Sequence, residues 1–83
     1  MNEDEYEEVA DEPATPKSWA VFSDIAGQIA RGVLNPGDRL PSTAQLQSRY
    51  LVSGVVVRSA MHWLKADGLV VGVPGVGVFV ATR

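Results

Sequence analysis

The chain has 83 residues, of which 46% are hydrophobic and 20% charged, and its net charge at neutral pH is −3. This length provides one small domain and no more, and with no cysteine and a single histidine the chain lacks the residues of a disulfide frame or a thiolate or histidine metal cluster. No apolar run approaches the roughly 20 residues of a membrane-spanning helix, and the acidic N-terminus is unlike a secretory signal, so we expect a cytoplasmic protein without cofactor.

The charge is unevenly distributed along the chain. Residues 1–16 hold seven acidic residues and no lysine or arginine, a charge of −7, whereas residues 17–83 hold seven basic and three acidic residues, a charge of +4. The first segment has too little apolar surface to offset chain entropy. We therefore predict a disordered acidic tail over residues 1–16 and a folded domain over residues 17–83. The tail is either a solvated segment or one that screens the basic body or binds a partner.

The first helix is expected to begin near Ser18, a suitable N-cap residue, and to stop at Gly32. Spacings of three and four place one set of apolar residues on a single face: Phe22, Ile25, Ala26, Ile29 and Val33. Trp19 is also expected in the core. The Asn-Pro-Gly-Asp sequence at residues 35–38 then predicts a turn.

The second and third helices have clear starts. Ser42 and Gln45 have the spacing of a capping box, which predicts a helix of about eight residues ending near Tyr50. Ser53 is the N-cap candidate for a third helix that runs to about residue 67. In that helix, the buried stripe is predicted to be Val57, Ala60, Met61 and Leu64, the outward face Val55, Ser59, His62 and Ala66, and the flanks Arg58 and Trp63.

The end of the chain changes to a β pattern. Residues 69–73 and 78–81 are β-rich and are separated by the Pro-Gly-Val-Gly sequence at 74–77, which predicts a β-hairpin. The predicted fold class is therefore mainly α with a small β-hairpin, a three-helix winged helix-turn-helix.

Three segments carry a family resemblance: GVLNPGDRLPS at 32–42, VSGVVVRSAMHWLKADGLV at 52–70 and GVGVFVA at 75–81. In this order and spacing they resemble the DNA-binding domain of GntR-type bacterial regulators. The resemblance implies a small transcriptional regulator, bacterial or phage, whose partner is double-stranded DNA, with helix 53–67 in the major groove and wing 72–78 beside it. Such regulators normally continue into an effector-binding, dimerising domain, and the chain is expected to act without one.

The resemblance also implies DNA-contacting residues, which are expected to be Ser42, Thr43, Arg49, Ser53, Arg58 and Gly75. Three positions where the family carries arginine instead hold Ala44, Gly54 and Val76. DNA affinity depends mainly on lysine and arginine neutralising phosphates, and valine cannot replace them. The expected site is therefore weak for a single domain.

The same replacements leave a second interpretation open. Val55, Val56 and Val76 would expose apolar groups, which often mark interaction surfaces, and Trp63 either adds to that surface or covers the domain's own core. The alternative is a winged helix repurposed as a protein–protein interaction module, binding a protein partner or a second copy, with weak or no DNA binding. An enzyme is not expected, because the folded body has no paired carboxylates, no nucleophile with a base and no phosphate loop.

Overall fold

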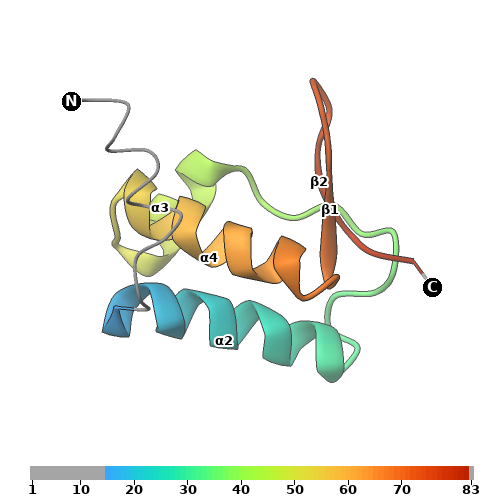
Figure 1. The fold of residues 1–83 in the computed structure, drawn as a ribbon, viewed down its shortest axis with the longest axis horizontal. Helices are drawn as coiled ribbons and strands as arrows, with labels where there is room; N and C mark the ends of the chain where they lie inside the picture. The colour runs from blue at the N-terminus through green and yellow to red at the C-terminus, as the bar shows by residue number, and fades with distance from the viewer. Residues whose placement is uncertain (1–14, 83) are drawn as a thin grey trace.

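The computed structural model describes residues 15–82, which form three helices followed by a two-stranded hairpin (Figure 1). Helix α2 spans Pro16–Ala30, α3 spans Thr43–Tyr50 and α4 spans Gly54–Ala66, and the antiparallel strands β1 and β2 span Val70–Val73 and Gly77–Val80. This is the predicted winged helix-turn-helix. Most of the predicted disordered tail, residues 1–14, lies outside the described residues.

Helix α2 begins one turn earlier than predicted. Its N-cap is Thr15, whose Oγ1 accepts a hydrogen bond from the Ser18 N–H at 3.1 Å, while Ser18 Oγ accepts one from the Thr15 N–H at 3.0 Å. Ser18 is thus the third helical residue of a capping box and not the N-cap. Pro16 fits the first helical turn because proline lacks an N–H at a position where none is needed. Pro16 therefore belongs to the folded domain.

The starts of α3 and α4 are as predicted. Ser42 Oγ accepts from the Gln45 N–H at 3.1 Å and Gln45 Oε1 accepts from the Ser42 N–H at 2.8 Å, which completes the capping box of α3. Ser53 Oγ accepts from the Val56 N–H at 3.3 Å and so caps α4. The connection between these helices is very short because Leu51 adopts a left-handed conformation, with φ 58°.

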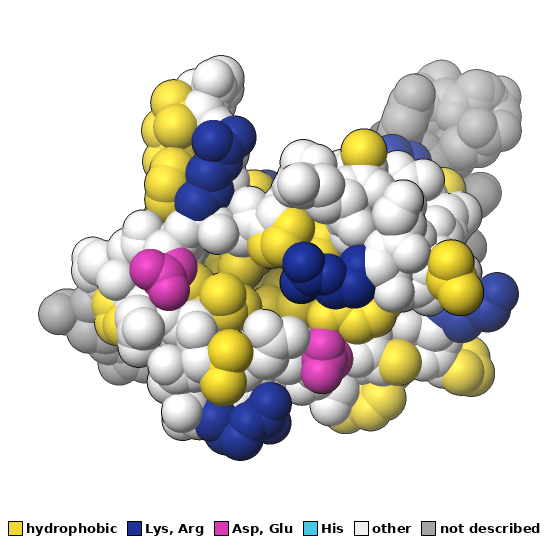
Figure 2. Space-filling model, turned by 180° about the vertical axis from the view of Figure 1, so that it is seen from behind, with side chains coloured by type: hydrophobic (Ala, Val, Ile, Leu, Met, Phe, Trp, Pro, Cys, Tyr) yellow, Lys and Arg dark blue, Asp and Glu magenta, His cyan; other side chains and the backbone are white. Residues whose placement is uncertain are grey.

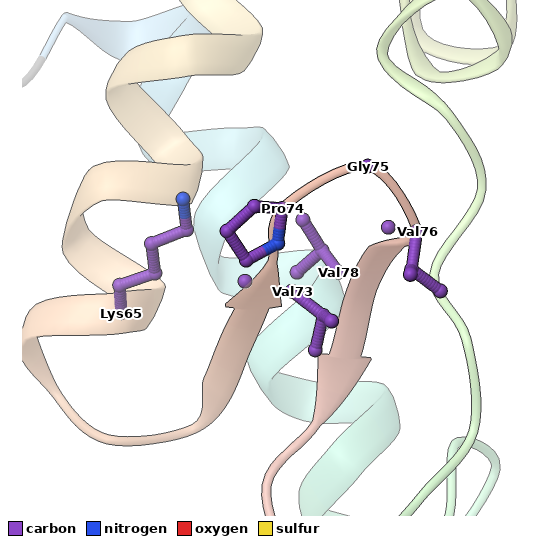
Figure 3. Close-up of a pocket in the computed structure, with 8 residues that line it drawn as sticks. Lys65, Val73, Pro74, Gly75, Val76 and Val78 are labelled. Carbon is purple, nitrogen blue, oxygen red and sulfur yellow. The ribbon is translucent and has the colours of Figure 1, made fainter.

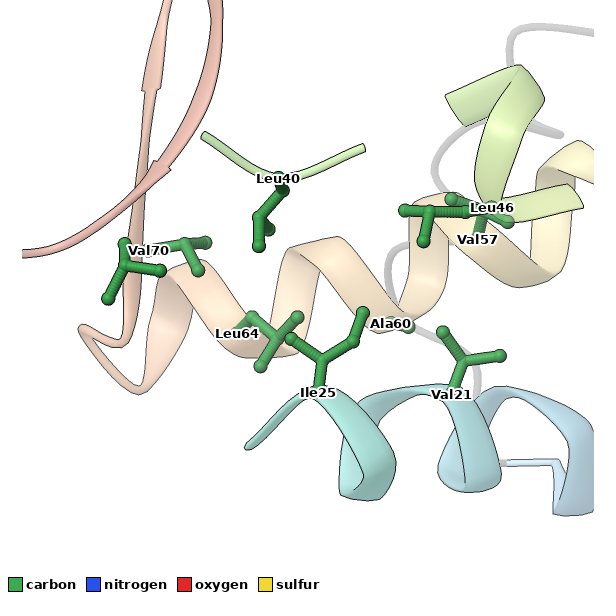
Figure 4. Close-up of a cluster of buried hydrophobic side chains, with 9 residues drawn as sticks. Val21, Ile25, Leu40, Leu46, Val57, Ala60, Leu64 and Val70 are labelled. Carbon is green, nitrogen blue, oxygen red and sulfur yellow. The ribbon is translucent and has the colours of Figure 1, made fainter. Parts of the chain in front are cut away.

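Helix α4 lies at the centre of the core (Figure 4). Val57, Ala60 and Leu64 of α4 are fully buried against Val21 and Ile25 of α2, with further buried side chains from the segments around them: Leu40, Leu46, Val70 and Val80. Ser59, predicted to face outward, is buried too. Because α4 packs against both α2 and α3, its buried arc is wider than the predicted stripe.

Two predicted core residues are instead exposed. Val33 is 60% exposed because α2 ends at Ala30 and the chain has left the helical face by residue 33. Trp19 is 54% exposed, and its ring lies 5.2 Å from that of Phe22. The apolar side chain that α2 buries in this region is Val21, which the pattern of spacings missed.

The hairpin has a third, short strand-like neighbour that the sequence did not predict. Arg39 pairs with Phe79 in an isolated antiparallel bridge, and Leu40 N–H donates to the Val78 carbonyl at 2.8 Å. The Val80 N–H donates to the Asp38 carbonyl, also at 2.8 Å. The predicted turn at 35–38 is closed by a 2.9 Å hydrogen bond from the Asp38 N–H to the Asn35 carbonyl. This turn places residues 38–40 beside β2. The segment before α3 therefore anchors the base of the hairpin.

None of the helices within residues 15–82 combines the length and apolar composition that crossing a membrane would require.

Candidate nucleic-acid interface

The face of α4 turned away from α2 is open to solvent. Val55, Arg58, His62 and Lys65 are exposed there, at spacings of three and four, whereas Val57, Ala60 and Leu64 are buried on the other side. An exposed helix surface of this kind, which projects from a helix-turn-helix, has the dimensions of a major-groove reader.

The start of α4 brings two of the predicted contact residues together. A Cβ placed on Gly54 would lie 3.7 Å from Nη1 of Arg58 and 3.6 Å from Oε1 of Gln47. The Arg58 guanidinium therefore folds back toward the first turn of α4, next to the Ser53 cap. A helix start leaves backbone N–H groups unpaired and carries partial positive charge, so this corner can bind an anion such as a phosphate. Gln47, on α3, is a neighbour that the sequence analysis did not select.

The start of α3 forms a second polar corner. Ser42 and Thr43 are exposed at its N-terminus, and Arg49 is exposed nearly two helical turns beyond. Ser42 and Arg49, but not Thr43, border an open hollow of about 440 Å³, which is lined by Arg39, Leu40, Pro41, Ser42, Gln45 and Arg49. Arg39 was not selected from the sequence, because only the pairing of residue 39 with β2 brings it here.

The tip of the hairpin carries no charge of its own. Gly75 takes a positive φ of 76° in the turn, and the adjacent Val76 is 51% exposed (Figure 3). The cations lie at its sides. A Cβ on Gly77 would lie 2.8 Å from Arg39 Nε, and one on Gly72 would lie 3.2 Å from Lys65 Nζ. Figure 2 shows the hairpin, at upper left, with a basic side chain beside a column of hydrophobic ones. Lys65, like Arg39, was missed from the sequence.

The residues proposed for a protein-binding surface do not all share one exposed face. Val55 and Val76 are exposed, at 41% and 51%. Val56 instead packs against the core, and Trp63 is half-buried, with its ring edge-on to Phe22 at 6.1 Å. Both lie on the side of α4 that meets α2. Trp63 thus covers the domain's own core. Of the four residues proposed for a protein-binding surface, only Val55 and Val76 are therefore exposed.

Comparison with known proteins gives one consistent result. Residues 17–80 match the family described as Bacterial regulatory proteins, gntR family. The sequence is 43% identical over 56 residues to the mannosyl-D-glycerate transport/metabolism system repressor MngR of Escherichia coli K12, covering 68% of this chain and 23% of that protein. It is 40% identical over 57 residues to the histidine utilization repressor of Klebsiella aerogenes, covering 69% of this chain and 24% of that protein.

A solved structure has the same fold. The crystal structure of AraR(DBD) in complex with operator ORX1 superimposes with a TM-score of 0.78 at 33% identity, covering 81% of each chain. The present chain therefore matches an operator-bound domain over most of its length, while it spans only about a quarter of the curated repressors.

Proposed function

The chain belongs to the GntR family of bacterial regulatory proteins, and we propose that it binds double-stranded DNA as a small transcriptional regulator. The observation that carries this proposal is the position of Arg58. Its guanidinium lies beside the capped first turn of α4, on the helix face that is free of core contacts. A cation and a row of backbone N–H groups at one helix start suit a DNA phosphate or a base edge.

The proposed docking puts α4 into the major groove. Ser53 and the first amides of α4 lie toward a phosphate, and Arg58 reaches either that phosphate or a guanine edge. The corner of α3 at Ser42, Thr43 and Arg49 then faces the neighbouring backbone. The wing, with Gly75 at its tip, lies beside the groove that α4 occupies. The similarity to an operator-bound AraR domain supports this arrangement.

The affinity of one domain is expected to be low. Ala44 and Val76 are exposed and uncharged at positions where the family resemblance implies arginine. Each lost phosphate contact lowers both the affinity and its dependence on salt. Two domains on two half-sites are the usual way in which such motifs gain affinity.

The test is fluorescence anisotropy of a labelled specific duplex, selected from a mixed-sequence pool for tight binding, which is titrated at low salt with the full chain. Arg58→Ala is expected to weaken binding by more than about tenfold, in line with roughly 1–3 kcal/mol for a base contact. Arg31→Ala is the matched control, because the Arg31 guanidinium lies back over Gly27 on α2. Equal affinity of the Arg58 variant and the unsubstituted chain would show that the proposed docking is wrong.

A further inference from the structure

The two faces of the hairpin are defined by its register. Val73 pairs with Gly77 and Gly72 pairs with Val78. Paired residues in antiparallel strands present their side chains on the same face, and successive residues alternate between faces. Positions 73 and 77 therefore share one face of the hairpin, and positions 72 and 78 share the other.

A cation lies against each of these faces. Arg39 arrives from the segment before α3 and runs over Gly77, where an added Cβ would meet its Nε at 2.8 Å. Lys65 arrives from the last turn of α4 and ends over Gly72, where an added Cβ would meet its Nζ at 3.2 Å. Figure 3 shows the Lys65 side chain directed along the hairpin, whereas the Val76 side chain points away from Lys65. Both glycines thus leave room for a basic side chain that comes from another part of the fold.

The hairpin between these cations is apolar. Pro74, Gly75 and Val76 form its tip, and Val73 is exposed beside them. Uncharged tips cannot attract phosphates, but an apolar tip fits against sugars and base edges in a groove. The charges on either side are then the groups that meet the backbone.

Building on the DNA-binding function proposed above, we propose that Arg39 and Lys65 are phosphate-binding residues that hold the apolar wing in the minor groove of DNA. Because they lie on opposite faces of one hairpin, each faces a different strand of the duplex. The minor groove is about 6 Å wide, so only the tip of the hairpin enters it, and a phosphate backbone then lies beside each face of the hairpin. In this arrangement two cations at the sides of the wing replace the arginine that the family resemblance implies at its tip.

The first experiment measures the salt dependence of binding to an A·T-rich duplex by the full chain. Arg39→Gln and Lys65→Gln are each expected to reduce the slope of log K against log salt by about one, and the double variant by about two, since one phosphate contact contributes about 0.9. Arg39→Lys, which keeps the charge, is expected to restore the slope. Arg31→Gln is the control and is expected to leave it unchanged.

The second experiment locates these contacts. Netropsin, which fills the minor groove of A·T tracts, is bound to the duplex before the protein is added. It is expected to weaken binding by the unsubstituted chain and to have little further effect on the double variant.

The outcomes separate the two proposals. Slopes that stay unchanged in both single variants, while the unsubstituted chain binds DNA, would overturn the role of the two cations alone. Equal weakening of the unsubstituted chain and the double variant by netropsin would also overturn it, because the cations would then act elsewhere. Failure of the unsubstituted chain to bind any duplex at low salt would overturn the DNA-binding function itself.

Discussion

The phenol of Tyr50 on α3 donates a hydrogen bond to Oδ2 of Asp24 on α2, and Nε2 of Gln28 donates to the same oxygen at 3.0 Å. Burial, followed by the hydrogen bond to Asp24 and the negative charge of that carboxylate, raises the pKa of Tyr50 from 10.0 to about 12. The bond joins two helices that are far apart in the sequence. It therefore fixes the end of α3, and with it the turn into α4, on the first helix.

Tyr50→Phe tests this link. Removing one hydrogen bond is expected to lower the free energy of unfolding at neutral pH by about 1 kcal/mol. The pKa of Tyr50 is higher in the folded state than in the unfolded state, so its contribution is present below pH 10 and is lost as pH rises toward 12. Urea unfolding of both chains between pH 8 and 12 is the measurement. An equally steep alkaline loss in the variant would assign the pH dependence to other groups.

Leu64→Ala tests the core. Leu64 is fully buried between α4 and α2, and truncation of such a side chain costs roughly 2–5 kcal/mol. A domain of this size has little more stability than that, so thermal unfolding is expected to show a largely unfolded variant at 37 °C. Leu51→Ala removes the same atoms from a side chain that is 85% exposed. The Leu51→Ala variant is expected to change the free energy of unfolding by about 0.5 kcal/mol or less. A comparable loss of stability in the Leu51 and Leu64 variants would contradict the assigned core.

Val76→Arg tests whether the wing lies close to DNA. Val76 is exposed at the tip, so an arginine fits there without disturbing the core. One additional phosphate contact is expected to raise the affinity for a duplex by about tenfold at low salt and to steepen the salt dependence by about one. Val33→Arg adds the same charge at a similarly exposed position in the loop after α2. Equal gains from both variants would indicate a general charge effect and no wing contact.

The acidic N-terminal segment is expected to oppose DNA binding. Its seven carboxylates outnumber the +4 charge of the rest of the chain, and they repel phosphates or compete with them for the basic side chains. Replacing all seven by the corresponding amides in the full chain is predicted to raise the affinity roughly tenfold at low salt. The gain is expected to vanish at high salt because it is electrostatic. An affinity unchanged at every salt concentration would show that the segment does not act on the interface.

Local sequence signals predicted most of the fold. The caps at Ser42 and Ser53, the turn at 35–38 and the hairpin are set by residues within a few positions of one another, and all are confirmed. The start of α2 was placed one turn late because Thr15 and Ser18 both suit an N-cap, and only the reciprocal bonds between them identify the first as the cap. Ser59 and Trp19 were assigned to the wrong surfaces because periodicity gives a helix one buried face, whereas the extent of that face depends on how many neighbours pack on it.

The site was less predictable than the fold. Arg58 and Ser53 were selected because the family resemblance implies DNA contacts at these two positions, and the structure brings them together at the start of α4. Arg39 and Lys65 lack any such local signal. Their side chains reach the hairpin only through the pairing of residue 39 with β2 and the packing of the end of α4 beside β1. These are long-range contacts, which no spacing in the sequence encodes.

The hydrogen bonds from residues 37–40 to β2 have a consequence for the thermodynamics of binding. They attach the base of the hairpin to the middle of the domain as well as to the end of α4 (Figure 1). The angle between the hairpin and α4 is therefore already set in the free protein. Because ordering a loop on binding costs conformational entropy, a wing held in place beforehand loses less. If the proposed function holds, this pre-organisation is expected to compensate partly for the few positive charges of the proposed DNA-binding surface.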